Sequence, residues 1–146
     1  MFRGHFSHTI DPKGRLSIPS KFRDALATGF GDRLVIVPTD NALDVHPLKT
    51  WEALEARISS LPRLDADARQ FRYQYISHGL DVTLDPQGRI QINPQYRERS
   101  GLMKDVQIIG MTDYFEVWDA KRWAAFQHDI AAPLDDLRER LAAKGV

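Results

Sequence analysis

The chain of 146 residues contains no cysteine, which excludes disulfide bonds and thiolate metal sites. It also has no run of about 18 apolar residues, so no membrane-spanning helix is predicted. Its first eight residues, Met-Phe-Arg-Gly-His-Phe-Ser-His, lack the apolar core of a signal peptide. From these absences we expect a cytoplasmic protein that has no membrane partner.

An excess of charge is missing as well, since 20 basic side chains balance 20 acidic ones. This balance argues against a globally basic nucleic-acid-binding protein. The distribution is uneven, however, because residues 1–26 carry five basic and two acidic side chains, a net charge of +3. These are Arg3, Lys13, Arg15, Lys21 and Arg23 against Asp11 and Asp24. Such a local basic end attracts phosphate, especially when several chains bring their basic ends together.

What the chain does contain is an internal repeat. Residues 9–24 read Thr-Ile-Asp-Pro-Lys-Gly-Arg-Leu-Ser-Ile-Pro-Ser-Lys-Phe-Arg-Asp, and residues 83–98 read Thr-Leu-Asp-Pro-Gln-Gly-Arg-Ile-Gln-Ile-Asn-Pro-Gln-Tyr-Arg-Glu. The similarity continues from the apolar run 34–37 to Trp51, and from the run 106–109 to Trp123. An internal repeat identifies the folding unit, so we expect one small unit to be built twice.

Each copy carries the signature of a strand, a tight turn, a second strand and a short helix. Asp-Pro-Lys-Gly at residues 11–14 has the residue preferences of a type I turn. In the alternating segment that follows, Leu16 and Ile18 point to one face and Arg15 to the other. Ile90 and Ile92 repeat the apolar pair. We therefore predict that the apolar pairs are core, and that an arginine stands on the opposite face.

The pattern predicts an α+β fold, in which two tandem β units form a pseudo-symmetric core with flanking helices. Strands are expected at 34–37, 43–45, 106–109 and 114–118, and helices at 48–61, 65–77, 122–130 and 134–143. We divide the chain into a first repeat (5–51), connecting helices (52–80), a second repeat (81–124) and a C-terminal helical segment (125–146). Units of this size bury too little surface to be stable alone, so the copies should share one core.

The repeat and its flanks resemble the MraZ family of the SpoVT–AbrB superfamily of swapped-hairpin DNA-binding proteins. The resemblance rests on the opening Met-Phe-Arg-Gly and on two Asp-x-x-Gly-Arg elements. It also rests on Phe-Glu-Val-Trp-x-x-x-x-Trp at 115–123. It covers about residues 1–125.

The resemblance implies a bacterial, nucleoid-associated transcription regulator that binds short direct repeats in the promoter of its own division and cell-wall gene cluster. It implies a ring-shaped homo-oligomer without a cofactor, a small-molecule substrate or enzymatic activity. The DNA-contacting element maps onto Asp11 and Arg15, and onto Asp85 and Arg89. Lys13, within the first element, and Arg3, which precedes it in the sequence, are candidate phosphate contacts; the second element has Gln87 in place of Lys13.

Some of these residues have structural roles as alternatives to DNA contact. Arg15 lies four residues from Asp11 across a turn, so an ion pair that stiffens the turn is an alternative, and the two roles can coexist. Arg23 and Arg97 recur on the short helices, where pairing with a neighbouring carboxylate and contact with DNA are the two alternatives. His5 and His8 have no third ligand at a useful spacing, so we predict no metal site.

Two other classes of function compete with the DNA-binding regulator. An antidote-like interaction module of the same superfamily should have one copy of the unit and a disordered tail, whereas this chain has two copies and a helical C-terminal pattern. A small hydrolase needs a nucleophile or a metal constellation, and the sequence shows neither.

Overall fold

A computed structural model describes residues 1–130 and 133–146. The strands are β1 (His5–Thr9), β2 (Arg15–Ser17), β3 (Arg33–Pro38), β4 (Leu43–Pro47), β5 (Leu80–Thr83), β6 (Arg89–Gln91), β7 (Asp105–Gly110) and β8 (Phe115–Asp119). The helices are α1 (Ser20–Gly29), α2 (Leu48–Ser59), α3 (Ala66–Gln74), α4 (Pro94–Arg99), α5 (Ala120–Asp129) and α6 (Leu134–Ala142). A short 3-10 helix, η1 (Ile76–His78), precedes β5. The fold is α+β, as predicted, with antiparallel strand pairing.

The two copies exchange strands. Six strands form one sheet in the order β1-β7-β8-β4-β3-β5, and β2 pairs with β6 in a separate two-stranded ribbon. Thus β1 of the first copy pairs with β7 of the second, while β5 of the second pairs with β3 of the first. Ser7 lies opposite Gln107, and its repeat equivalent Asp81 lies opposite Val35. The same register on both sides gives the protomer a pseudo-twofold axis.

That axis passes through the middle of the ribbon and of the β4–β8 pair. Leu16 lies opposite its own repeat equivalent Ile90, and Asp44 lies opposite its equivalent Glu116. The main core lies between the sheet, α1 and the ribbon, and it draws buried side chains from both copies. Leu16, Ile18, Ile90 and Ile92 are all buried in it, which confirms their predicted orientation and the prediction of one shared core.

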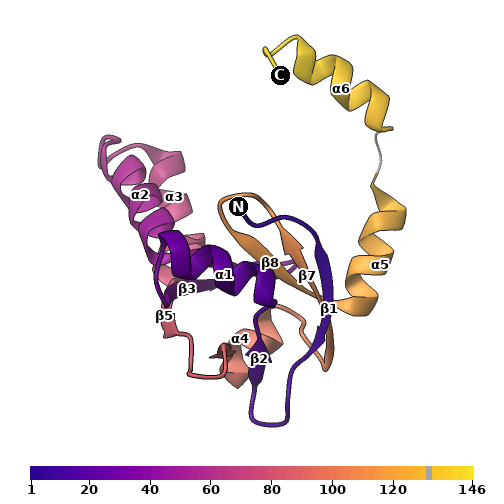
Figure 1. Ribbon diagram of the computed structural model, residues 1–146. Coiled ribbons are helices and arrows are strands. Elements are labelled where there is room, and N and C mark those ends of the chain that lie inside the picture. The colour runs from indigo at the N-terminus through magenta and orange to yellow at the C-terminus, as the bar shows by residue number, and fades with distance from the viewer. Residues whose placement is uncertain (131–132) are drawn as a thin grey trace.

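The other face of the sheet is covered by helices at two places. Trp51 of α2 packs on Val35 and Val37 of β3, and Trp123 of α5 packs on Trp118 and Ile109. In Figure 1, α2 and α3 lie to the left of the sheet and α5 to its right. Among the described residues, no helix has the length and apolar character needed to span a bilayer.

One predicted helix is wrong in its last turn. The pattern predicted a single helix over 65–77, but α3 ends at Gln74 and Tyr75 leaves the helical conformation with φ −126° and ψ −64°. Its hydroxyl instead donates a hydrogen bond to Asp44 Oδ2 (2.5 Å) and accepts one from His46 Nε2 (2.7 Å). Contacts to two side chains of β4 therefore take precedence over helix continuation.

The buried network that Tyr75 joins contains two groups with opposed pKa shifts. Burial raises the pKa of Asp44 to about 6, with the Glu116 charge adding to the shift and the Tyr75 hydrogen bond opposing it. Burial lowers the pKa of His46 to about 4. Folding therefore favours the protonated form of Asp44 and the neutral form of His46.

We expect the network to make single variants pH-sensitive in opposite directions. Between pH 7 and pH 5 the folded state gains a proton at Asp44, which stabilises it, whereas the unfolded state gains one at His46, which destabilises the fold. Each effect amounts to about 1–2 kcal/mol, and in the wild type they offset. Urea unfolding should therefore show Asp44→Asn losing stability on acidification and His46→Gln gaining it. Variants that follow the wild-type pH profile would contradict the opposed shifts.

Candidate nucleic-acid interface

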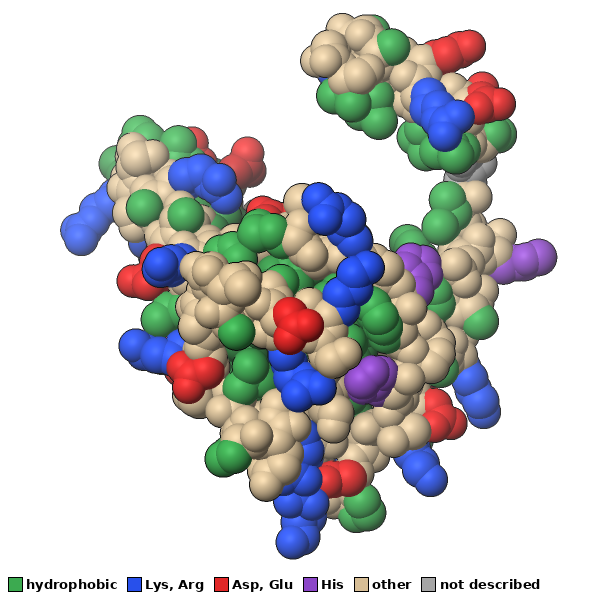
Figure 2. All heavy atoms as spheres, viewed as in Figure 1, with side chains coloured by type: hydrophobic (Ala, Val, Ile, Leu, Met, Phe, Trp, Pro, Cys, Tyr) green, Lys and Arg blue, Asp and Glu red, His purple; other side chains and the backbone are tan. Residues whose placement is uncertain are grey.

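The β2–β6 ribbon presents both repeated arginines on one face. Leu16 and Ile90 turn into the core, so Arg15 and Arg89, one residue before each, point to the opposite side. Arg15 lies opposite Gln91, and Arg89 lies opposite Ser17. The two arginines are therefore diagonal neighbours, a relation in which Cα atoms lie about 7–8 Å apart. The ribbon lies at the lower end of the molecule in Figure 1, where Figure 2 shows basic side chains with an acidic one beside them.

The first turn is closed by its aspartate. Asp11 Oδ1 accepts hydrogen bonds from the backbone N–H groups of Lys13 and Arg15, both at 2.9 Å. Its Oδ2 accepts the Arg15 Nε–H at 2.6 Å. The backbone hydrogen bond from Arg15 is the main cause that holds the pKa of Asp11 below its ordinary value. The predicted turn-stiffening ion pair is thus confirmed.

The second turn repeats this geometry. Asp85 Oδ1 accepts from the N–H groups of Gln87 and Arg89 at 2.9 Å, and its Oδ2 accepts Arg89 Nε–H at 2.8 Å. Burial opposes ionisation of Asp85, but the hydrogen bonds from Arg89 outweigh it and lower the pKa of the carboxyl. In the described part of the chain each arginine bonds its aspartate through Nε alone, so its two terminal amino groups make no hydrogen bond to that carboxylate. Such a fork can bind a phosphate or a guanine edge.

The turns differ in what holds and surrounds them. Gln91 Nε2 donates to the Lys13 carbonyl at 2.5 Å, so the second copy ties down the first turn. The repeat equivalent of Gln91 is Ser17, and in the described part of the chain it makes no such bond to the second turn. There, Arg89 Nη2 instead approaches Gln87 Oε1 at 3.4 Å. Backbone hydrogen bonds hold both turns across the ribbon, from Ile92 N–H to the Gly14 carbonyl (2.8 Å) and from Ile18 N–H to the Gly88 carbonyl (3.0 Å). The first turn has the Gln91 side-chain bond in addition, and it carries an additional cation.

Arg23 and Arg97 pack against the turn of the opposite copy. A Cβ atom at Gly88 would meet the Arg23 side chain, and one at Gly14 would lie 3.3 Å from Arg97 Cζ. Arg23 Nε donates to the carbonyl of Ile18 at 3.1 Å. Neither arginine forms an ion pair with a carboxylate within the described ranges, so the predicted carboxylate pairing is wrong. A tertiary contact between the copies, which the sequence does not show, takes its place.

This close packing predicts that Gly14→Ala destabilises the fold. Gly14 has φ +81°, and an added Cβ would lie 2.7 Å from the Ile92 carbonyl oxygen. Gly31 has the same φ and open space around it, so Gly31→Ala is a matched control for the backbone cost alone. We expect Gly14→Ala to lower the free energy of unfolding by about 2–4 kcal/mol and Gly31→Ala by about 1 kcal/mol, measured by urea denaturation. Equal losses would show that the close approach carries no cost.

Comparison with known proteins identifies the family. A family model described as "MraZ protein, putative antitoxin-like" matches residues 1–73 and 76–144. The chain belongs to the MraZ family. The "Transcriptional regulator MraZ" of Acetivibrio thermocellus is 39% identical over 147 residues, covering all of both chains. The protein of the same name from Limosilactobacillus fermentum is 38% identical over 94% of both chains. That from Lactiplantibacillus plantarum is 38% identical over 97% of this chain and 98% of its own.

Six DNA-contacting residues were predicted from the sequence. Five of them lie around the ribbon: Asp11, Lys13, Arg15, Asp85 and Arg89. The sixth, Arg3, does not. Arg3 stands before β1, beside the bridge between Phe2 and Thr112, whereas Lys13 follows β1 at its other end. Figure 1 shows the N-terminus and the β1–β2 loop far apart. Arg3 is therefore separated from the first turn by the length of β1, although it is near that turn in the sequence.

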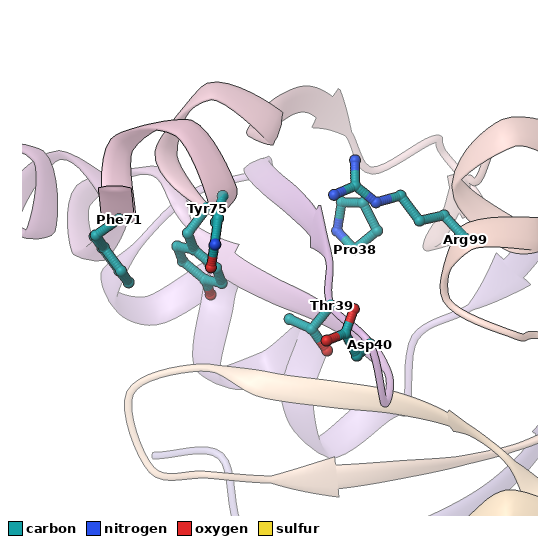
Figure 3. Close-up of a pocket in the computed structure, with 7 residues that line it drawn as sticks. Pro38, Thr39, Asp40, Phe71, Tyr75 and Arg99 are labelled. Atoms are coloured by element: carbon teal, nitrogen blue, oxygen red, sulfur yellow. The ribbon is translucent and has the colours of Figure 1, made fainter. Parts of the chain in front are cut away.

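A cavity of about 420 Å³ lies away from the ribbon (Figure 3). Pro38, Thr39 and Asp40 line it from the β3–β4 turn, Tyr75 from the end of α3 and Arg99 from the end of α4. Its lining includes one carboxylate and one guanidinium, which do not make up a nucleophile with its base. Within residues 1–130 and 133–146, no three His, Asp or Glu side chains are grouped so that they could hold a metal ion.

Proposed function

We propose that this chain is a DNA-binding transcription regulator that contacts duplex DNA through the β2–β6 ribbon. The observation that carries the proposal is the pair of Asp-x-x-Gly-Arg turns, which present two braced arginines on one face of a two-stranded ribbon. The major groove of B-DNA admits such a ribbon, and arginine is the usual partner of guanine there. Membership of the MraZ family and the name of its relatives support this assignment.

In this proposal the protomer is a tandem AbrB-like swapped-hairpin unit. The exchange of β1 and β5 between the copies, with the ribbon on the pseudo-twofold axis, supports it. Asp11 and Asp85 orient Arg15 and Arg89, and Lys13 adds a phosphate contact at the first turn. Arg3, at the other end of β1, reaches DNA only where a neighbouring protomer or a bent duplex brings phosphate to that end.

We further propose that the protein is a nucleoid-associated homo-oligomer, assembled as a ring, without a cofactor or enzymatic role. Its DNA target is a set of short direct repeats upstream of its own division and cell-wall gene cluster. The protomer offers few cations on the ribbon, so a single contact is weak and several protomers on spaced repeats are needed for avidity. An antidote-like role is disfavoured because the second copy and α5 occupy the place of a disordered partner-binding tail.

Binding to DNA from upstream of the protein's own gene should depend on repeat spacing and on salt. Raising the salt from 50 to 200 mM should weaken binding steeply, because each neutralised phosphate releases counterions. Changing the spacing by half a helical turn should weaken it by about tenfold or more, because avidity needs simultaneous engagement. Gel-shift titration with light scattering of the complex measures both. Affinity that is indifferent to spacing, or a monomer at micromolar concentration, would contradict the multi-protomer arrangement.

A further inference from the structure

A shallow cavity of about 390 Å³ lies beside the first turn and is built by both copies. Ile10, Asp11 and Pro12 line it from the first copy, and Arg97, Met103 and Lys104 from the second. The Ile10 N–H donates to the Lys104 carbonyl at 2.8 Å, which fixes Lys104 next to the start of the turn. Two cations from the second copy thus flank the first Asp-x-x-Gly-Arg element.

The one acidic group in this cavity is already neutralised. The Asp11 carboxylate accepts the Arg15 guanidinium and two backbone N–H groups. Asp105, the neighbour of Lys104 in the chain, lines a different cavity together with Ser7 and Thr9. The Lys104 ammonium is therefore exposed at a place where no unpaired carboxylate shares its cavity among the described residues.

The pseudo-twofold axis places an opposite charge at the second turn. Leu84 is the repeat equivalent of Ile10, and its N–H donates to the Asp32 carbonyl at 2.9 Å. Asp32 therefore occupies beside the second turn the position that Lys104 occupies beside the first. Counted over this flanking position and over Lys13 against Gln87, the first turn carries three more positive charges than the second.

We infer that Lys104 is a DNA phosphate contact of the first turn, supplied by the second copy, and that Asp32 repels phosphate from the second turn. The inference rests on the proposed DNA-binding function. It assigns most of the affinity for DNA to the first turn of the ribbon. A phosphate in this cavity beside Pro12 would meet Lys104 and Arg97, and the carboxylate that lines the same cavity, Asp11, is already paired. At the second turn, the same phosphate would meet the Asp32 carboxylate, which costs affinity.

The test measures binding to duplex DNA from upstream of the protein's own gene, over a series of salt concentrations. Lys104→Gln should weaken binding about three- to tenfold at low salt and reduce the slope of log K against log salt by about 0.9 for each engaged protomer. Asp32→Lys should tighten binding and steepen that slope. Lys49→Gln, an exposed lysine on α2 across the sheet, is the matched control and should leave both quantities unchanged.

The outcomes separate this inference from the proposed function. If Lys104→Gln binds like Lys49→Gln while Arg15→Ala loses affinity, Lys104 does not contact DNA and the inference is overturned, although the ribbon still binds. Unchanged affinity for Asp32→Lys would overturn the assignment of Asp32. If the wild-type protein shows no preference for this DNA over an unrelated duplex, the proposed function itself fails. A wild-type melting temperature for Lys104→Gln shows that any loss of affinity is not unfolding.

Discussion

A fragment of residues 1–60 should not fold as a monomer. It retains the β3–β4 hairpin but removes β7, β6, β5 and β8, which are the partners of β1, β2, β3 and β4 in turn. The main core also loses the buried members that come from the second copy: Ile90, Ile92, Leu102, Val106, Ile108, Phe115 and Val117. A unit this small without its core partners has too little buried apolar surface to offset its conformational entropy.

The measurement is a thermal melt followed by circular dichroism, with the molecular mass determined in the same solution. We expect the fragment to be unfolded or aggregated. The control is a mixture of residues 1–60 and 65–146, divided in the exposed connection between α2 and α3, which should regain a cooperative transition because every strand pair is restored. A cooperative melt from monomeric 1–60 would show that the first copy is an independent domain and that strand exchange is dispensable.

The local elements were predictable because each depends on neighbours in the sequence. Alternation correctly placed Leu16 and Ile18 in the core, and the short helix predicted after the second strand of the second copy is α4, which begins at Pro94. The asparagine before that proline, a departure from the first copy, is explained by the structure: Asn93 Oδ1 accepts the Tyr96 N–H at 2.8 Å and caps the helix. Caps and alternation are local effects, which single-sequence patterns capture.

A shared core was predictable from the repeat, but the individual residue contacts between the copies were not. The repeat indicates that one unit occurs twice, but not that β1 pairs with β7 of the other copy, since the two strands are about a hundred residues apart in the chain and no local pattern names the partner. The packing of Arg97 against Gly14 and of Arg23 against Gly88 follows from this exchange. The two turns of the candidate site could therefore be predicted from the sequence. The residues of the other copy that pack against each turn could not.

Arg15→Ala should weaken DNA binding by about tenfold or more, and Arg89→Ala should weaken it less. An arginine with a bidentate base contact contributes about 1–3 kcal/mol of discrimination. The first turn has Lys13 beside its arginine, and Gln91 holds the Lys13 carbonyl at 2.5 Å. This side-chain bond adds to the backbone bonds that hold both turns across the ribbon, and a turn that is held more firmly loses less conformational entropy on binding. The second turn offers Gln87, a neutral side chain that itself lies within 3.4 Å of Arg89.

The two variants are matched controls for each other. Each removes one aspartate–arginine pair of nearly equal length, 2.6 Å for Arg15 and 2.8 Å for Arg89, with arginine side chains 33% and 27% exposed. Half-exposed pairs of this kind contribute at most about 1 kcal/mol to stability, so both melting temperatures should stay close to that of the wild type.

A difference in affinity between the two variants then reports on DNA contact rather than on the fold. Lys13→Ala should mainly flatten the salt dependence, by about 0.9 in the slope for each engaged protomer, because it removes one phosphate contact. Gel-shift titration of the three variants against the same DNA measures these effects. If Arg89→Ala is the more damaging, the second turn is the principal contact, and the asymmetry of charge around the ribbon does not decide how DNA is bound. If Arg15→Ala unfolds the protein, the ion pair with Asp11 is foremost a structural element.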